Sequence, residues 1–215
     1  MTPELAKPEL SPAEERANSI SHGLGLVASL AAAPILMMTA IKAGNSWTIF
    51  GALVYAATMI SLYLASTLYH SLPERLGKTF FRNLDHAAIF LLIAGTYTPF
   101  SLGVMRGPWG WTLLGSVWTL ALIGLILKAV PRTRYSRVSI VLYVIMGWLA
   151  VIATRPILAL VPAPGVLLII AGGLAYTSGL VFFGMRRLRF HHLIWHLFVM
   201  AGTVCHFFAV LWYSG

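Results

Sequence analysis

Seven long apolar segments alternate with short polar breaks along the chain. Each segment holds about 20 residues, the length that crosses the ~30 Å hydrocarbon core of a bilayer when a helix rises about 1.5 Å per residue. Turn-forming residues mark the breaks, as at Gly44–Asn45 and Gly107–Pro108 and between residues 156 and 165. We therefore expect an all-α membrane protein, a seven-helix transmembrane bundle with spans at 20–42, 47–70, 85–105, 110–130, 138–157, 164–185 and 193–213.

The composition excludes an ordinary water-soluble globule. Of the 215 residues, 59% are hydrophobic and only 10% are charged, which leaves too little polar area to cover a surface that faces water. The net charge of +9 would favour a nucleic-acid partner if the chain were soluble. Here the basic residues lie in short loops between apolar segments, where they meet the anionic head groups of lipids. We expect membrane lipids as partners and no nucleic acid.

A polar arm precedes the first apolar segment. Residues 1–18 are rich in proline and glutamate and lack the basic start of a secretory signal. Ser11, Pro12 and Glu14 have the spacing of a capping box with proline at the first helical position, so a short polar helix should begin there. We expect two parts, the arm at 1–18 and a single transmembrane domain at 19–215.

The lysines and arginines indicate how the bundle is oriented. When the loops are assigned to alternate sides, twelve basic residues share the side of the N-terminus, and only Lys42, Arg106 and Arg155 lie on the other. Short cytosolic loops carry the excess of basic residues in membrane proteins. The N-terminus is therefore predicted to be cytosolic and, after seven spans, the C-terminus faces the opposite side. The twelve are Lys7, Arg16, Arg75, Lys78, Arg82, Lys128, Arg132, Arg134, Arg137, Arg186, Arg187 and Arg189.

Histidines gather at the predicted cytosolic ends of the helices. His192 and His196 are four residues apart, so a helix presents both imidazoles on one face. His70, at the end of the second span, can supply a third nitrogen. Polar groups at membrane depth are costly unless they are paired or bind something, and three histidines with an open fourth position are typical of a catalytic zinc site. The six histidines at this level are His22, His70, His86, His191, His192 and His196, with only His206 deeper.

Asp85 and Ser66 are the candidate catalytic residues beside this site. Asp85 opens the third span and is the only acidic residue within a predicted span. It could be a fourth ligand, a general base for the metal-bound water, or an acceptor that orients an imidazole, and the last two roles are favoured. Ser66 precedes His70 by one helical turn, so its hydroxyl can bond to a ligand or to water, or back to its own helix.

Other polar residues near the helix ends have simpler interpretations. His22 could join the site, although a histidine at the membrane interface is a more common arrangement. Glu15 and Asn18 are expected to hold the arm against the bundle. His86 and His191 are each adjacent in sequence to a site residue, so on a helix they point about 100° away from it. We expect these two to face loops or lipid head groups.

Two features lie deeper in the predicted spans. His206 follows His196 by ten residues, about 15 Å along a helix axis, so the two cannot share one ion. Bundle packing is the expected role of His206, with a separate polar pocket as the alternative. Pro99 should kink the third span, and the hydroxyls at 96–98 can meet the backbone groups that the kink frees.

The motif residues follow one another in a recognisable order. Ser66-x3-His70 comes first, then Asp85, then His192-x3-His196. The surrounding stretches read ASTLYH at 65–70, AGTYTPF at 94–100 and HLIWHLFV at 192–199, and an upstream element holds Glu15, Asn18, Ser21 and His22. From about residue 14 to 213, this combination resembles the hemolysin III family, the bacterial branch of the progestin and adipoQ receptors that include the adiponectin receptors.

The resemblance implies a seven-helix bundle in the bacterial inner (plasma) membrane, with zinc near the cytosolic face. Histidines that match His70, His192 and His196 would hold the metal, and an aspartate that matches Asp85 would lie near the metal-bound water. The family resembles a wider group that includes alkaline ceramidases, which hydrolyse a lipid amide, and its bacterial members are associated with membrane lipid homeostasis. Because the chain lacks a large N-terminal regulatory domain, a hormone-receptor role is not expected.

Three functions are compatible with these residues. In the favoured one, the protein is a zinc-dependent hydrolase in which zinc polarises the carbonyl of a lipid amide or ester and Asp85 acts as base or positions the water. In the second, zinc is a structural pin between the second and seventh spans of a membrane-state sensor or homeostasis factor without turnover. The third, a pore-forming cytolysin, is suggested by the family name alone, because no span shows a charged stripe.

Overall fold

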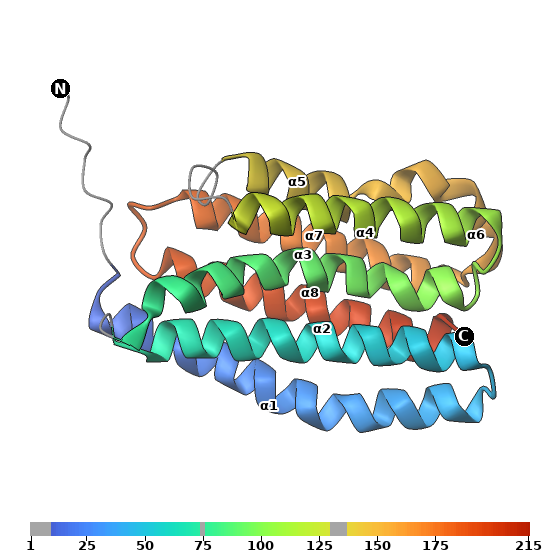
Figure 1. Cartoon of the computed structure of the whole chain (residues 1–215), viewed down its shortest axis with the longest axis horizontal. Helices are drawn as coiled ribbons and strands as arrows, with labels where there is room; N and C mark the ends of the chain where they lie inside the picture. Colours follow the sequence, from blue (N-terminus) through green and yellow to red (C-terminus); the bar gives the residue numbers. More distant parts are fainter. Residues whose placement is uncertain (1–9, 74–75, 130–136) are drawn as a thin grey trace.

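The chain folds into an elongated bundle of helices that run roughly along one axis (Figure 1). The computed structural model describes residues 10–73, 76–129 and 137–215, and these contain helices and turns but no strand. Successive long helices run in opposite directions, and the first helix begins at the end of the bundle opposite the C-terminus (Figure 1). Lys7, Arg75, Arg132 and Arg134, which contributed to the predicted orientation, lie outside the described residues.

Helices account for the predicted apolar segments. The fifth segment, expected as one helix at 138–157, is divided into α5, a 3-10 turn and α6. The other predicted spans each overlap one helix, with ends that differ by a few residues except at the start of the first and third. The elements are α1 (Pro12–Lys42), α2 (Ser46–Ser71), α3 (Lys78–Leu102), α4 (Pro108–Ala129), α5 (Arg137–Gly147), the 3-10 turn η2 (Leu149–Ala153), α6 (Thr154–Leu160), α7 (Ala163–Gly184) and α8 (His191–Tyr213).

The first helix begins well before the first predicted span. The Ser11 hydroxyl accepts a hydrogen bond from the Glu14 N–H, and the Glu14 carboxylate accepts from the Ser11 N–H at 2.9 Å. This capping box, with Pro12 in the first turn, is the one expected from the sequence. The helix does not end after the polar arm but continues to Lys42, so the expected short helix and the first span are one element.

Among the described residues, six helical segments are long and apolar enough to cross a membrane. They are α1, α2, α4, the combined segment Arg137–Leu160, α7 and α8. α3 has 25 residues but is more polar, because it carries Asp85, His86 and the hydroxyl residues at 96–98. Its position explains how that polarity is tolerated: α3 packs against both α2 and α4, so its polar side chains meet protein and not lipid.

The break in the fifth segment is bonded to α3. The Tyr97 hydroxyl shares its one proton between the carbonyls of Met146 and Gly147, at 2.9 and 3.0 Å, and accepts from the Ala150 N–H at 3.0 Å. The Tyr97 side chain thus provides hydrogen-bond partners for backbone groups that are exposed where α5 ends. In an apolar environment these groups must find internal partners, so the break is stable only because α3 lies beside it.

Pro99 lies inside α3, as the sequence predicts, but its neighbours act differently from the prediction. The hydroxyls of Thr96 and Thr98 donate to the carbonyls of Leu92 and Ala94. Each hydroxyl has one proton, so neither can serve the carbonyl that the proline ring leaves without an N–H donor. The expected use of these hydroxyls at the proline is therefore wrong.

The outer surface of the bundle is apolar. Val27 on α1 is 65% exposed, and Leu167 and Val181 on α7 are 66% and 63% exposed. The interior is more polar in places, with Tyr55 and Tyr63 fully or almost fully buried on α2. Exposed aliphatic side chains around a partly polar interior are what a lipid solvent requires.

Candidate metal centre

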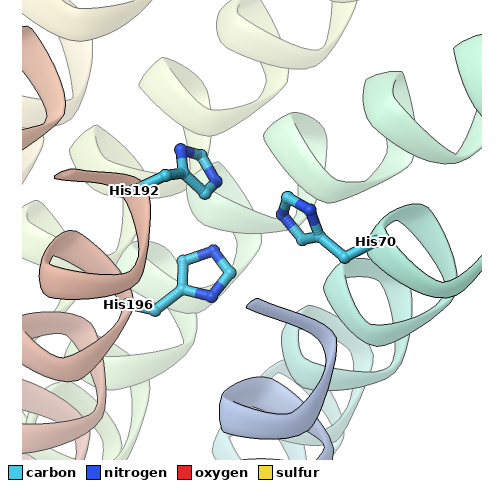
Figure 2. Close-up of side chains that lie close together, drawn as sticks. All are labelled: His70, His192 and His196. Carbon is cyan, nitrogen blue, oxygen red and sulfur yellow. The ribbon is translucent and has the colours of Figure 1, made fainter. Parts of the chain in front are cut away.

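Three histidines from two helices converge at the end of the bundle where α1 and α8 begin. His70 lies in the last turn of α2, while His192 and His196 project from the first turns of α8. One ring nitrogen from each lies within 4.8 Å of the others. Figure 2 shows the three imidazoles pointing toward a common centre. The sequence prediction that these three residues lie together is confirmed by the structure.

The nitrogens of these rings suit a metal ion. The Nε2 atoms of His70, His192 and His196 are all buried, and no described residue bonds to any of them. A buried polar atom without a partner is costly, so three in one place indicate a missing ligand. Imidazole is a good ligand for zinc and other transition metals, and three such donors leave a fourth position for water or substrate.

His70 is held by a carboxylate. Its Nδ1 lies 2.6 Å from Oε2 of Glu15, and the other oxygen of Glu15 accepts from Nζ of Lys78 at 2.8 Å. Glu15 therefore joins α1 to both α2 and α3. From the sequence we expected Glu15 only to hold the arm against the bundle; the structure also puts it in direct contact with a candidate ligand.

His196 is contacted from two sides by α1. Its Nδ1 lies 3.2 Å from the Ser21 hydroxyl oxygen. The ring of His22 stacks on the ring of His196, with centroids 3.5 Å apart and planes 10° from parallel. His22 is only 1% exposed, so it is a buried residue and not a histidine at the membrane interface. It lies beside the group of three and is not a member of it.

Asp85 and Ser66 are both buried close to this centre. Asp85 is 2% exposed, lies on a cavity wall and interacts electrostatically with His70 and with Lys128 of α4. It is not part of the three-histidine group. Ser66 is fully buried, and its hydroxyl interacts with the Asp85 carboxylate and not with its own helix.

A large cavity runs from the metal centre into the bundle. Its volume is about 1130 Å³, and its walls come mainly from α3, α5, α7 and α8. The far part has aliphatic and aromatic walls. The part near the centre is basic, with six cationic side chains on its lining, namely Lys78, Arg82, Lys128, Arg186, Arg187 and Arg189.

His86 and His191 line the same cavity, which corrects the expectation that they face loops or lipid head groups. His86 is offset from Asp85 by about 100° around the helix, as expected. Because α3 lies among other helices, however, this side of α3 also faces protein. Nδ1 of His86 bonds to the Arg82 carbonyl at 2.7 Å, and the hydroxyl of Tyr143 on α5 donates to the His86 carbonyl at 2.7 Å.

His206 lies deeper on the cavity wall. Its Nε2 donates to the carbonyl of Ile169 on α7 at 3.1 Å, and its ring packs against Tyr176 with centroids 5.3 Å apart. It is outside the three-histidine group, as its distance along the helix predicts. His206 therefore has both of the roles considered from the sequence: it joins α7 to α8, and it also lines the cavity.

Comparison with known proteins assigns the chain to a family. The family model for Haemolysin-III related proteins matches residues 10–207, a range that includes every site residue described above. The chain belongs to the haemolysin III family. This confirms the resemblance seen in the sequence motifs.

Relatives of this haemolysin III family member cover almost its whole length. Hemolysin-3 of Bacillus cereus is 46% identical over 200 residues, which cover 93% of this chain and 91% of the relative. The Hemolysin-3 homolog of Bacillus subtilis (strain 168) is 42% identical over 200 residues, with coverage of 93% and 94%. Monocyte to macrophage differentiation factor of Homo sapiens is 25% identical over 205 residues, with coverage of 92% and 83%, which fits the adiponectin-receptor-like superfamily.

The family and the six apolar helical segments together assign the location of this haemolysin III protein. It is a multi-pass integral membrane protein, and its bacterial relatives assign it to the bacterial inner membrane. The lipid bilayer is therefore the solvent for its apolar outer surface.

Proposed function

We propose that this haemolysin III protein is a zinc-dependent hydrolase that cleaves an amide or ester bond of a membrane lipid and so takes part in membrane lipid homeostasis. The observation that carries the proposal is the group of three unpartnered Nε2 atoms next to a cavity of about 1130 Å³. A metal site at the end of a lipid-sized cavity is the arrangement that such a reaction needs.

The metal would be held by His70, His192 and His196. A zinc ion with three imidazole ligands acidifies a coordinated water and polarises a carbonyl. Asp85 takes a proton from the attacking water as the new bond between oxygen and the carbonyl carbon forms. It then returns the proton to the leaving amine or alcohol as the old bond to carbon breaks. The Ser66 hydroxyl holds the water or the carbonyl oxygen during this exchange.

The cavity walls suit a lipid that comes from the bilayer. Apolar side chains of α3, α5 and α7 line the far part and can contact an acyl chain. The cationic side chains near the centre can contact a polar or anionic head group. The scissile bond would then lie between these two regions, beside the three histidines.

A structural role for the metal is the second candidate. The ligands come from α2 and α8, and the other bonds between these helices are few: the hydroxyls of Tyr55 and Tyr63 donate to the carbonyl and the side chain of Thr203. A metal that joins the two helices would fix the bundle without any turnover. In that case the protein would be a membrane-state sensor or homeostasis factor.

One comparison separates the two candidates. Wild type and Asp85→Ala are purified, bound zinc is measured, and hydrolysis of ceramide-like and phospholipid substrates is assayed. If the protein is a hydrolase, Asp85→Ala keeps zinc and loses turnover by about 100- to 10,000-fold, the usual contribution of a general acid or base. Zinc in both proteins with turnover in neither would support the structural pin. Leakage from dye-filled vesicles in the same samples would instead favour a pore.

A further inference from the structure

We propose that the first turns of α1 set the tautomers of the metal-binding histidines. Glu15 and Ser21 each hold one ligand imidazole so that Nδ1 carries the proton and Nε2 keeps its lone pair for the metal. The inference rests on the proposed metal site and assigns two positioning residues to it.

The Glu15 carboxylate determines the tautomer of His70. Its Oε2 lies 2.6 Å from Nδ1 of His70. A carboxylate can only accept, so the imidazole must donate its Nδ1–H. A neutral imidazole has a single N–H, which leaves Nε2 with a lone pair, and that nitrogen is the buried, unpartnered one. A carboxylate behind a ligand histidine also makes the imidazole a stronger donor to the metal.

Glu15 is itself held in one orientation. Its second oxygen, Oε1, accepts from Nζ of Lys78 at 2.8 Å. Each carboxylate oxygen therefore has a separate partner, one on α2 and one on α3. Because the carboxylate is bonded on both sides, the imidazole of His70 is held at a fixed angle to the metal centre.

Ser21 determines the tautomer of His196, with a hydroxyl group in place of a carboxylate. Its hydroxyl donates its one proton to the Asn18 carbonyl at 2.8 Å. The oxygen can then only accept, and it lies 3.2 Å from Nδ1 of His196. The imidazole must donate this bond from Nδ1–H, which again leaves the buried, unpartnered Nε2 with its lone pair.

Glu14 fixes the start of the helix that carries two of the ligands. Its Oε1 accepts from the Phe190 N–H at 2.8 Å. Phe190 precedes α8 with φ 58°, a left-handed conformation that a non-glycine residue keeps only when its surroundings hold it. Residues from one short stretch of α1 thus position α8 and orient ligands on both α2 and α8.

The zinc affinity of the purified full-length protein in detergent tests the proposal, with zinc alone as the probe and a chelator as competitor. Ser21→Ala and Glu15→Ala are expected to weaken zinc binding by about 10- to 100-fold, the usual effect of removing the partner of a ligand histidine. Glu15→Gln keeps an acceptor oxygen but loses the charge, so its loss should be smaller. Ser21→Thr, which keeps the hydroxyl, should retain wild-type affinity.

Ser29→Ala is the matched control. Ser29 is also buried on α1 and also donates to its own helix, to the Gly25 carbonyl at 2.7 Å, but it contacts none of the three histidines. Its zinc affinity should equal that of wild type. Nitrogen-15 spectra of the zinc-loaded, histidine-labelled wild type should show protonated Nδ1 and metal-bound Nε2 at His70 and His196.

Two different results would overturn the proposal. If wild type binds zinc and both Ser21→Ala and Glu15→Ala bind it as tightly as Ser29→Ala, the positioning role is wrong and the metal site stands. Spectra that show the metal bound through Nδ1 of His70 or His196 would also show that the positioning role is wrong. If wild type binds no zinc, the proposed metal site itself is wrong, and the positioning role is lost with it.

Discussion

Ser66 is fully buried beside the candidate metal centre, where its hydroxyl interacts with the Asp85 carboxylate. A serine hydroxyl has one proton to donate and two lone pairs that can accept. It therefore has acceptor capacity left for a bound water while it contacts Asp85. The two candidate catalytic side chains thus form one connected pair.

Ser66→Ala should lower turnover about tenfold or more while zinc content stays unchanged, because a hydrogen bond to the reacting oxygen is lost and no ligand is removed. Ser101→Ala is a suitable control, since Ser101 is also buried but lies at the far end of α3 from Asp85. Lipid hydrolysis and zinc content are measured in both. Equal turnover in the two variants would exclude a role for Ser66.

The sequence was sufficient to bring the three candidate ligand histidines together but not to find their hydrogen-bond partners. His192 and His196 are four residues apart, and helical geometry alone places them on one face. The contact between Glu15 and His70 joins residues that are 55 positions apart and depends on how α1 packs against α2. Periodicity describes one helix at a time, so it carries no information about such a contact.

The fifth apolar segment is a second case in which the pattern of a single helix does not predict the structure. Its residues are mainly apolar from 138 to 157, and Gly147 alone is too weak a signal to predict a break at Trp148. The reason for the break lies on another helix, where the Tyr97 hydroxyl serves Met146, Gly147 and Ala150. Capping chemistry at Ser11 and Glu14, in contrast, is local, and the sequence predicted it correctly.

Tyr97→Phe should lower the free energy of unfolding by about 1 to 3 kcal/mol, because backbone groups at the break lose their partner in an apolar environment. The measurement is denaturant or thermal unfolding in detergent. Tyr213→Phe, at the end of α8, is the control for loss of a tyrosine hydroxyl. If the two variants unfold alike, the bonds from Tyr97 do not stabilise the break.

In the whole molecule, the cationic side chains of the cavity lining and the candidate metal centre share one end of the bundle. These side chains lie near the beginnings of α3 and α8 and the ends of α4 and α7. By the positive-inside rule, we propose that this end is cytosolic. We propose seven passes, with α3 as a buried, more polar span between α2 and α4.

Reporters fused after Gly215 test this topology. Alkaline phosphatase should be active there and green fluorescent protein dark, because an odd number of passes puts the C-terminus opposite a cytosolic N-terminus. A fusion in the loop between α2 and α3 should show the reverse pattern. Cytosolic-type fluorescence at the C-terminus would contradict either the number of passes or the orientation.

Metal analysis of the purified full-length protein tests the central claim most directly. Wild type should carry about one zinc per chain at the three-histidine group. Zinc should be lost in His70→Ala and in the double variant His192→Ala with His196→Ala. It should be kept in His206→Phe, whose position lies about 15 Å along α8 from His196. A wild type without metal, or a double variant that keeps wild-type zinc, would contradict the account.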